Sequence, residues 1–366
     1  MIKTINGWRA VFALMIVLFH VGVAGLEEMT WAGVSFFLMA SGFLLTMKYP
    51  MSHADTGECL RFVGRHAAKL YPLHWLSLIL WVVVMTVLGL LSVRPLSLAL
   101  NVTLLHPWSL MHSIYYSYNQ FSWFLGTLLF CYMCYPMLAR WFAVLRLRSQ
   151  TLILAGLMAV DIVVLAFMGG NDYYRTALYV FPPVRLIDFM IGMTLAMAYP
   201  RVRGLRVVGK SRTGTDAELV ALALLSVMVM TYRAYPGLLP WGDTVLWWVP
   251  VALIIAVSAT YDKREGLLGK ILASRPLQWL GDISFEIFML QGIAAIIFNY
   301  VFAPALFHVG LGHPSPFDTA GSTDLLSTDP YTLIAWFVLP VDIVLAWVVN
   351  RLFTRPVGRL MARLWR

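Results

Sequence analysis

Residues 10–26 read AVFALMIVLFHVGVAGL, an apolar run in which His20 is the only ionisable side chain. A run of this length predicts a transmembrane helix, which we place at 8–26. An ionisable group inside a membrane span is by default a candidate functional residue. Arg9 precedes the run, and eleven helical steps rise about 16 Å. Arg9 and His20 are therefore expected on one face of the helix, at different depths and out of contact.

The rest of the chain has the composition of a polytopic membrane protein. Of its 366 residues, 60% are hydrophobic and 12% are charged, and the mean hydropathy is +0.76, which excludes an ordinary soluble domain. Further spans are predicted at 31–49, 72–91, 121–139, 151–168, 185–199, 217–232, 243–260, 279–302 and 331–350. Polar residues interrupt 98–112, which favours an external interfacial segment there. The sequence thus predicts an all-α protein in which residues 1–366 form a single bundle of about ten transmembrane helices, with no appended soluble domain.

Lys and Arg residues follow the alternation of these spans. Twenty-three of the 27 lie on one predicted side, at Lys3 and Arg9 and within 48–69, 140–148, 201–212, 263–275 and 351–366. By the positive-inside rule both termini are expected to be cytoplasmic. This distribution explains the net charge of +9 without a nucleic-acid partner. Aromatic residues and a Gly/Ser/Asp-rich segment at 308–330 mark the opposite side, where they could form an interfacial belt or a platform for a sugar ring.

Several polar residues in or near the spans are candidates for chemistry. His20 is a candidate general base, or a structural histidine bonded to a neighbouring helix. Arg65 and Lys69, four residues apart, present two cations that suit phosphate oxygens as well as anionic lipid headgroups. Arg185 and Asp188 have the spacing of a structural salt bridge. The small residues of Ser41-Gly42-Phe43, set among bulky apolar ones, have the pattern of close helix packing. The three cysteines have no partner pair with zinc-ligand spacing, so no metal site is expected.

Five segments, taken in order, resemble the integral-membrane acyltransferase-3 family over roughly residues 5 to 300. The segments are Gly7-Trp8-Arg9 with His20, Gly33-Val34-Ser35-Phe36-Phe37 with Ser41-Gly42-Phe43, Arg65-x-x-x-Lys69-Leu70-Tyr71-Pro72, Val184-Arg185-Leu186-x-x-Phe189-x-x-Gly192, and Leu280-Gly281-x-x-Ser284. The chain departs from the family pattern at Gln291, where many members have histidine, and at Lys69, where an arginine is expected. It also lacks the acid of the fourth-span pattern between Trp123 and Tyr132.

The resemblance implies an O-acyltransferase of the bacterial inner membrane. Its donor would be an acyl-CoA, most often acetyl-CoA, and its acceptor a hydroxyl of a cell-surface glycan or of its lipid-linked precursor. His20 and Arg9 are then expected to be the catalytic residues, with His20 as general base or acyl carrier. Arg65 and Lys69 are expected to hold the donor, and Arg9 to help position it. The residues expected in supporting roles are Ser41, Trp123, Arg185, Asp188 and Ser284. The acceptor, the acyl chain length and the oligomeric state stay open.

A competing class is a proton-coupled transporter or flippase of a glycolipid or small molecule. Asp161, Asp342 and His20 would then form a proton relay in the membrane interior. Transporters of this kind often carry Gly/Pro-broken half-helices in matching halves of the chain, a pattern that this sequence does not show.

Overall fold

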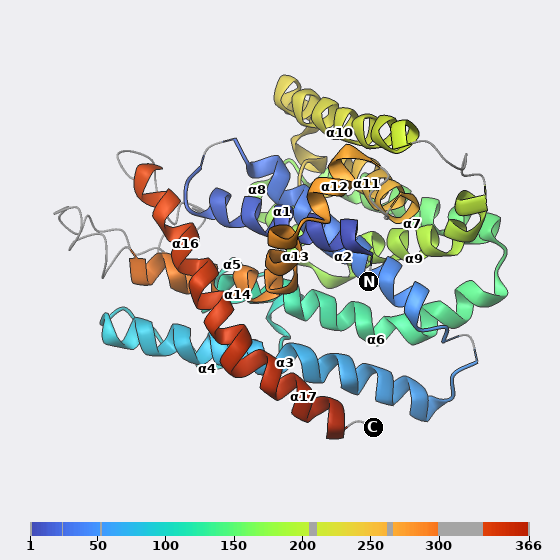
Figure 1. Ribbon diagram of the computed structural model, residues 1–366. Helices are drawn as coiled ribbons and strands as arrows, with labels where there is room; N and C mark the ends of the chain where they lie inside the picture. Colours follow the sequence, from blue (N-terminus) through green and yellow to red (C-terminus); the bar gives the residue numbers. More distant parts are fainter. Residues whose placement is uncertain are drawn as a thin grey trace. The chain divides into compact units, whose positions relative to one another are not determined.

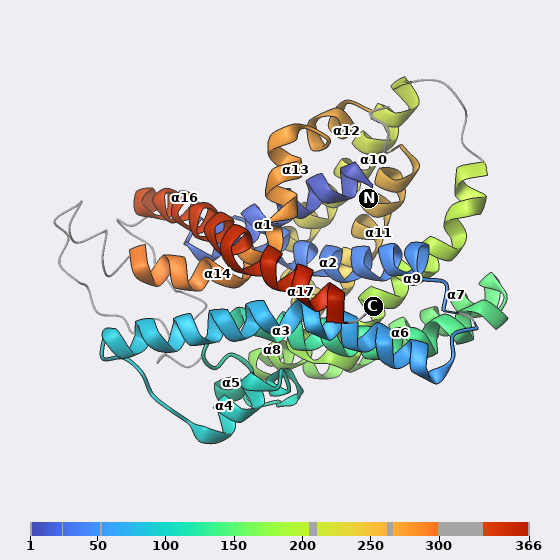
Figure 2. The same ribbon diagram turned by 60° about the horizontal axis from the view of Figure 1, so that its bottom comes forward.

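The computed structural model describes residues 2–23, 25–51, 53–204, 211–261, 266–298 and 332–364. Within these ranges the chain forms helices and no strand, which confirms the all-helical class (Figures 1 and 2). Some predicted features lie outside the described residues, namely the segment 308–330 and the cations Arg206, Lys210, Lys263, Arg264 and Arg366.

Among the described residues, six helices are long and apolar enough to cross a membrane: α2 (Glu27–Lys48), α3 (Thr56–Val87), α6 (Trp123–Val144), α7 (Leu147–Met168), α10 (Ser211–Ala234) and α16 (Thr332–Val349). Two bent pairs raise the number to eight. They are α8 (Asp172–Val180) with α9 (Pro182–Gly204), bent by 52°, and α13 (Arg275–Asp282) with α14 (Ser284–Ile297), bent by 69°. The protein is thus a helical, multi-pass membrane protein with six to eight candidate spans.

The other two predicted spans contain α1 (Lys3–His20) and α11 (Trp248–Thr260), which do not meet the same criteria of length and composition. The remaining short elements are α4 (Pro95–Val102), η1 (His106–Trp108), α5 (His112–Tyr115), η2 (Gln120–Ser122), η3 (Pro236–Trp241), η4 (Val245–Trp247), α12 (Leu267–Leu272), the π-helical turn η6 (Asn350–Thr354) and α17 (Arg355–Leu364).

Helix α1 ends at His20, six residues before the boundary predicted from the apolar run. The chain turns at Gly22 and Gly25, whose φ angles of 91° and 82° lie in the left-handed region that glycine adopts without steric cost. Glycine therefore stops the helix although the surrounding residues stay apolar. Arg9 and His20 do share one helix, as predicted, and His20 is its last residue.

The helices pack into two compact units. The first unit comprises Met1–Phe12, Glu28–Cys59 and Phe130–Asp282, and the second comprises Ala13–Glu27, Leu60–Leu129 and Ile283–Arg366.

In the first unit, contacts form between helix ends that are predicted to lie on the same side of the membrane. That prediction comes from the distribution of Lys and Arg among the loops. The Arg233 guanidinium donates to both carboxylate oxygens of Glu28 at 2.6 and 2.7 Å, and both residues lie at predicted outer ends. The Tyr135 hydroxyl donates to the Tyr49 carbonyl at 2.7 Å, and both lie at predicted cytoplasmic ends. These contacts agree with the predicted alternation of spans in this unit. The assignment of one side as cytoplasmic stays a prediction.

Helices α2 and α9 of the first unit approach each other at two glycines. A Cβ on Gly42 would overlap the Phe189 carbonyl oxygen, and a Cβ on Gly192 would overlap the Met39 carbonyl oxygen. Only glycine allows backbones to come this close, as small residues do at membrane helix interfaces. The interpretation of Ser41-Gly42-Phe43 as a packing motif is therefore confirmed at Gly42.

In the second unit, residues 95–122 fold back along α3. The Tyr71 hydroxyl, the His74 Nε2 and the Trp75 Nε1 donate to the carbonyls of Thr103, Asn101 and Val102, at 3.0, 2.7 and 3.0 Å. This differs from the prediction of a segment lying along the outer surface. Of the polar residues that interrupt the apolar run at 98–112, Asn101 and His106 are buried and form side-chain hydrogen bonds within this unit.

Helices α14 and α16 lie side by side in the same unit (Figure 1). A buried polar pair closes one end of this contact, where the Asn350 Nδ2 donates to Glu286 Oε1 at 2.7 Å.

Candidate functional site

The predicted site residues divide between the two units. Arg9, Ser41, Arg185 and Asp188 belong to the first unit. His20, Arg65, Lys69, Trp123 and Ser284 belong to the second.

The hydrogen bonds of His20 fix its tautomer. Its Nδ1 lies 2.8 Å from the Ile16 carbonyl oxygen, one helical turn back. Because a carbonyl only accepts hydrogen bonds, Nδ1 carries the proton in the neutral ring. The lone pair therefore lies on Nε2, at a side chain that stays partly accessible. This is the state that a general base or a nucleophilic imidazole requires.

Aromatic rings enclose His20 in the second unit. The Phe19 and Phe121 rings meet the imidazole edge-to-face, with centroids 5.2 and 4.8 Å away. Phe288 continues the wall, 6.1 Å from Phe121, and packs 5.2 Å from Phe124. Apolar rings around the imidazole lower the local polarity and so strengthen electrostatic interactions there.

Gln291 on α14 is the polar neighbour of His20. Its side chain interacts with the imidazole. Its Nε2 donates to the Phe288 carbonyl at 2.9 Å. Because a carbonyl only accepts hydrogen bonds, this contact shows which end of the amide is the nitrogen, and Oε1 points away from the Phe288 carbonyl. Oε1 is buried and accepts no hydrogen bond of standard geometry from a described residue. Gln291, noted in the sequence only as a departure from the family pattern, is thus next to His20.

Arg65 and Lys69 project from the exposed face of α3. The opposite face buries Phe62, His66 and Leu70, and His66 Nδ1 donates to the Phe62 carbonyl at 2.7 Å. This packing fixes the rotation of the helix and leaves both cations exposed. Arg65 Nε donates to the Arg61 carbonyl at 3.3 Å, and no described acidic side chain forms an ion pair with either cation.

Arg9 lies in the first unit beside a tyrosine that sequence analysis did not select. Arg9 is partly buried and interacts electrostatically with the Tyr132 side chain, which also hydrogen-bonds with Ser41. The Ser41 hydroxyl donates to the Phe37 carbonyl at 2.7 Å. Tyr132 belongs to the fourth-span pattern that lacks its acid, which was the signal available in the sequence.

Arg185 and Asp188 form a fully buried ion pair in the first unit, as their spacing predicted. Arg185 Nη1 lies 3.0 Å from Asp188 Oδ2. Arg185 Nε donates to the Tyr179 carbonyl at 2.8 Å, and Nη2 donates to the Asp243 carbonyl at 3.3 Å. The guanidinium also covers the Tyr179 ring at 4.3 Å. With every side of the guanidinium occupied by protein, the arrangement suits a structural role.

Trp123 and Ser284 are both buried in the second unit. Trp123 begins α6, and Ser284 begins α14 at the 69° bend. Their supporting roles stay a prediction.

Next to Trp123 the structure shows a buried polar cluster that sequence analysis missed. Ser122 Oγ lies 3.1 Å from His106 Nε2 and donates to the Asn119 carbonyl at 2.7 Å. Asn101 Nδ2 donates to Ser117 Oγ at 2.7 Å. Asn101 and His106 were visible in the sequence as polar interruptions, but their common partner Ser122 was not.

The two acids of the relay hypothesis are buried. Asp161 on α7 lies near the Arg185–Asp188 pair, with which it interacts electrostatically. Asp342 on α16 is fully buried, and its carboxylate has no hydrogen-bond partner among the described residues. No group of three or more His, Cys, Asp or Glu side chains that could hold a metal converges in the described ranges.

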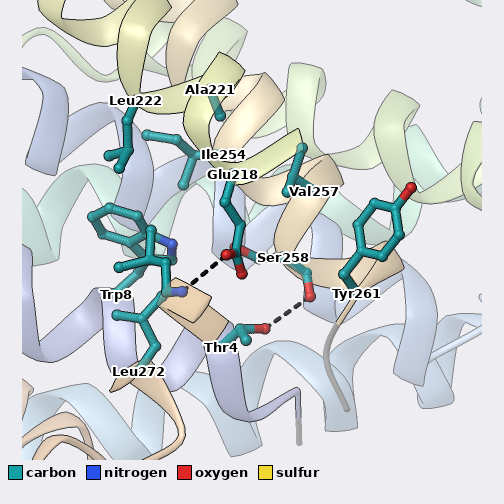
Figure 3. Close-up of a pocket in the computed structure, with 11 residues that line it drawn as sticks. Thr4, Trp8, Glu218, Ala221, Leu222, Ile254, Val257, Ser258, Tyr261 and Leu272 are labelled. Carbon is teal, nitrogen blue, oxygen red and sulfur yellow. Dashed lines mark hydrogen bonds between the residues drawn. The ribbon is translucent and has the colours of Figure 1, made fainter. Parts of the chain in front are cut away.

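A small cavity lies in the first unit, lined by residues of α1, α10, α11 and α12 and by Tyr261 (Figure 3). Its volume of about 10 Å³ holds about one water molecule. The Glu218 carboxylate accepts hydrogen bonds from the Leu268 and Gly269 amides at 2.9 and 2.7 Å, and Thr4 donates to the Ser258 carbonyl at 2.8 Å. These bonds join helix ends, and the cavity is too small for an organic substrate.

Comparison with known proteins gives one family and two relatives. A family model described as an acyltransferase domain matches residues 2–351. The chain is 26% identical over 317 residues to YrhL of Bacillus subtilis (strain 168), whose name assigns it as a peptidoglycan O-acetyltransferase. It is 22% identical over 316 residues to the peptidoglycan O-acetyltransferase OatA of Listeria monocytogenes (serovar 1/2a, strain EGD-e). Each match covers 79% of this chain and 48% of the relative, so the chain spans about half the length of these relatives. No solved structure matches the chain at a significant level.

Proposed function

This chain belongs to the acyltransferase-3 family, and we propose that it is an O-acetyltransferase that moves an acetyl group from acetyl-CoA to a hydroxyl of a cell-wall glycan. The names of the two relatives make peptidoglycan the first acceptor to test. The candidate spans and the family fit a location in the bacterial inner membrane.

In the proposed reaction His20 is the general base. The acceptor oxygen attacks the thioester carbonyl carbon, and the hydroxyl proton passes to His20 Nε2. The new C–O bond forms, the C–S bond breaks, and the proton returns from His20 to the departing thiolate. The second proton stays on His20 Nδ1 throughout, and its hydrogen bond to the Ile16 carbonyl stabilises the imidazolium that forms.

Arg65 and Lys69 would hold the donor. Coenzyme A carries its phosphates at one end of a long flexible arm and its thioester at the other. Two exposed cations that no described acidic side chain pairs with offer charge-assisted hydrogen bonds to those phosphates. Arg9 would help to position the donor near the predicted cytoplasmic end of α1.

One observation carries this proposal: His20 presents an unprotonated Nε2 inside an aromatic enclosure, next to a polar side chain. The experiment uses the full chain in lipid nanodiscs with radiolabelled acetyl-CoA and soluble peptidoglycan fragments. His20→Ala should lower acetyl transfer by roughly 100-fold or more, the range that loss of general-base catalysis produces.

His112→Ala is the control histidine, because His112 lies on α5 with ring contacts to Tyr115 and Tyr116 and has no part in the proposed donor or base. We expect it to fold and to keep transfer within roughly threefold of wild type, since removing a side chain away from the chemistry leaves the catalytic step intact. A His20→Ala protein with near-normal transfer would contradict the role of His20. A wild-type protein that neither transfers nor hydrolyses the acetyl group would contradict the enzyme class and favour a transporter. Acetylated His20 found by mass spectrometry would replace the general-base role by an acyl-carrier role.

A further inference from the structure

His20 and Gln291 bring two hydrogen-bond acceptors together with no described donor between them. His20 Nδ1 donates its hydrogen to the Ile16 carbonyl, so Nε2 of the neutral ring is an acceptor. The Gln291 amide nitrogen donates one of its two hydrogens to the Phe288 carbonyl, and the amide oxygen of Gln291 is an acceptor too. The Ile16 carbonyl of α1 orients the imidazole, and the Phe288 carbonyl of α14 orients the Gln291 amide. With its single ring proton donated to the Ile16 carbonyl, the neutral imidazole has none to give to Gln291 Oε1.

A buried acceptor without a donor is unfavourable, and it marks a position where a ligand can supply one. Gln291 is 1% exposed, and its Oε1 has no partner among the described residues. A single hydroxyl has one proton and can serve only one of the two acceptors. Two neighbouring donors on one molecule can serve both.

We propose that His20 and Gln291 together form a subsite for an acceptor with two adjacent donors, namely a sugar hydroxyl next to a second hydroxyl or an acetamido N–H. The first hydroxyl donates to His20 Nε2 and is acylated, and the second group donates to Gln291 Oε1. The inference rests on the proposed function, because it assigns Gln291 a place in the acceptor step of that reaction.

The aromatic wall adds a surface for the same ligand. Phe121 meets His20 on one side and Phe288 on the other, with centroid distances of 4.8 and 6.1 Å. A Cβ on Gly292, the residue after Gln291, would lie 2.8 Å from the Phe121 ring. Gly292 therefore lets α14 approach Phe121 closely. Amphipathic sugar rings pack their apolar faces on aromatic rings of this kind.

The experiment measures acetyl transfer to soluble peptidoglycan fragments by the full chain in nanodiscs, with coenzyme A affinity measured separately. Gln291→Leu removes the acceptor oxygen and the bond to Phe288. Its kcat/KM for the fragments should fall by roughly 10- to 100-fold, as expected when a buried polar partner is left unpaired. The Kd for coenzyme A should stay within twofold of wild type.

Gln291→Glu separates substrate binding from a structural role. It keeps an acceptor oxygen but loses the amide hydrogens that donate to Phe288, so it should restore most of the transfer that Gln291→Leu loses. Gln150→Leu is the matched control, because Gln150 Nε2 also donates to backbone carbonyls at 2.6 and 3.1 Å while its buried Oε1 has no described partner. That variant should leave the fragment KM unchanged.

The outcomes separate this inference from the proposed function. If wild-type protein transfers acetyl and Gln291→Leu matches it within twofold, the subsite is wrong and the acyltransferase proposal stands. If Gln291→Glu is as defective as Gln291→Leu, the bond to Phe288 matters and the subsite is again wrong. If wild-type protein shows no transfer, the proposed function itself fails.

Discussion

Replacing Arg185 by leucine should lower the free energy of unfolding of the first unit, and the size of the loss follows from the contacts that Arg185 makes. Arg185→Leu leaves the Asp188 carboxylate buried without its counter-ion, 3.0 Å from where the guanidinium lay. It also leaves the carbonyls of Tyr179 and Asp243 without the donors that Arg185 supplies. Breaking a buried pair in this way costs about 3–5 kcal/mol. At about 2–4 °C per kcal/mol for a unit of this size, the melting temperature should fall by roughly 6–20 °C.

The double variant Arg185→Leu with Asp188→Leu should be less destabilised than the sum of the two single variants. With both charges gone, the desolvation penalty of an unpaired carboxylate disappears, and the remaining loss comes from the two carbonyls. We would follow thermal unfolding by tryptophan fluorescence in detergent, with circular dichroism as the check that helices form at low temperature.

Asp172→Ala is the control, because it breaks an ion pair in which the Asp172 side chain is 81% exposed, and such pairs contribute at most about 1 kcal/mol. The reasoning would be refuted if Arg185→Leu melted within 3 °C of wild type. Additive losses in the double variant would refute it equally.

Two further predictions concern the donor and the helix contact. Arg65→Gln and Lys69→Gln should each raise the Kd for coenzyme A by roughly tenfold at low salt and by less at high salt, because each removes an exposed contact between a cation and phosphate. Titration calorimetry measures the Kd, with Arg94→Gln as the control. An unchanged Kd would reject the assignment of these cations to the donor. Gly42→Ala should lower the free energy of unfolding by about 1–3 kcal/mol, because the new Cβ would overlap the Phe189 carbonyl. Gly156→Ala is the control and should be neutral or stabilising, because its Cβ would meet nothing within 4 Å. Equal melting temperatures for the two variants would contradict the close approach of α2 and α9.

Features that depend on neighbouring residues were predictable from the sequence. The helical class followed from the length of the apolar runs, and the Arg185–Asp188 pair followed from a spacing of three residues on a helix. The packing role of Gly42 followed from its small size among bulky residues. In each case the sequence itself contains the geometry, because helix periodicity fixes which residues are neighbours.

Features that depend on distant partners were not predictable. The contact between Tyr132, Arg9 and Ser41 joins three helices, and no local pattern links them. Polar residues at 98–112 were consistent both with an interfacial segment and with a buried network, because composition does not tell which groups supply their hydrogen bonds. The structure decides this through the bonds from α3 to Asn101, Val102 and Thr103.

The residues that carry the family resemblance fall into two physically different groups. Gly42 and Gly192, like Gly7 and Gly281, lie where a Cβ would overlap a neighbouring backbone, so their substitution acts on packing. His20 instead keeps an acceptor nitrogen that its own helix orients but leaves unbonded. Loss of product alone cannot distinguish these groups, because an unfolded protein and a chemically inactive one both yield none. Variants of the first group should lose melting temperature and activity together, whereas His20→Ala should lose activity at an unchanged melting temperature. Measuring both quantities on the same preparations is therefore what assigns a motif residue to the chemistry.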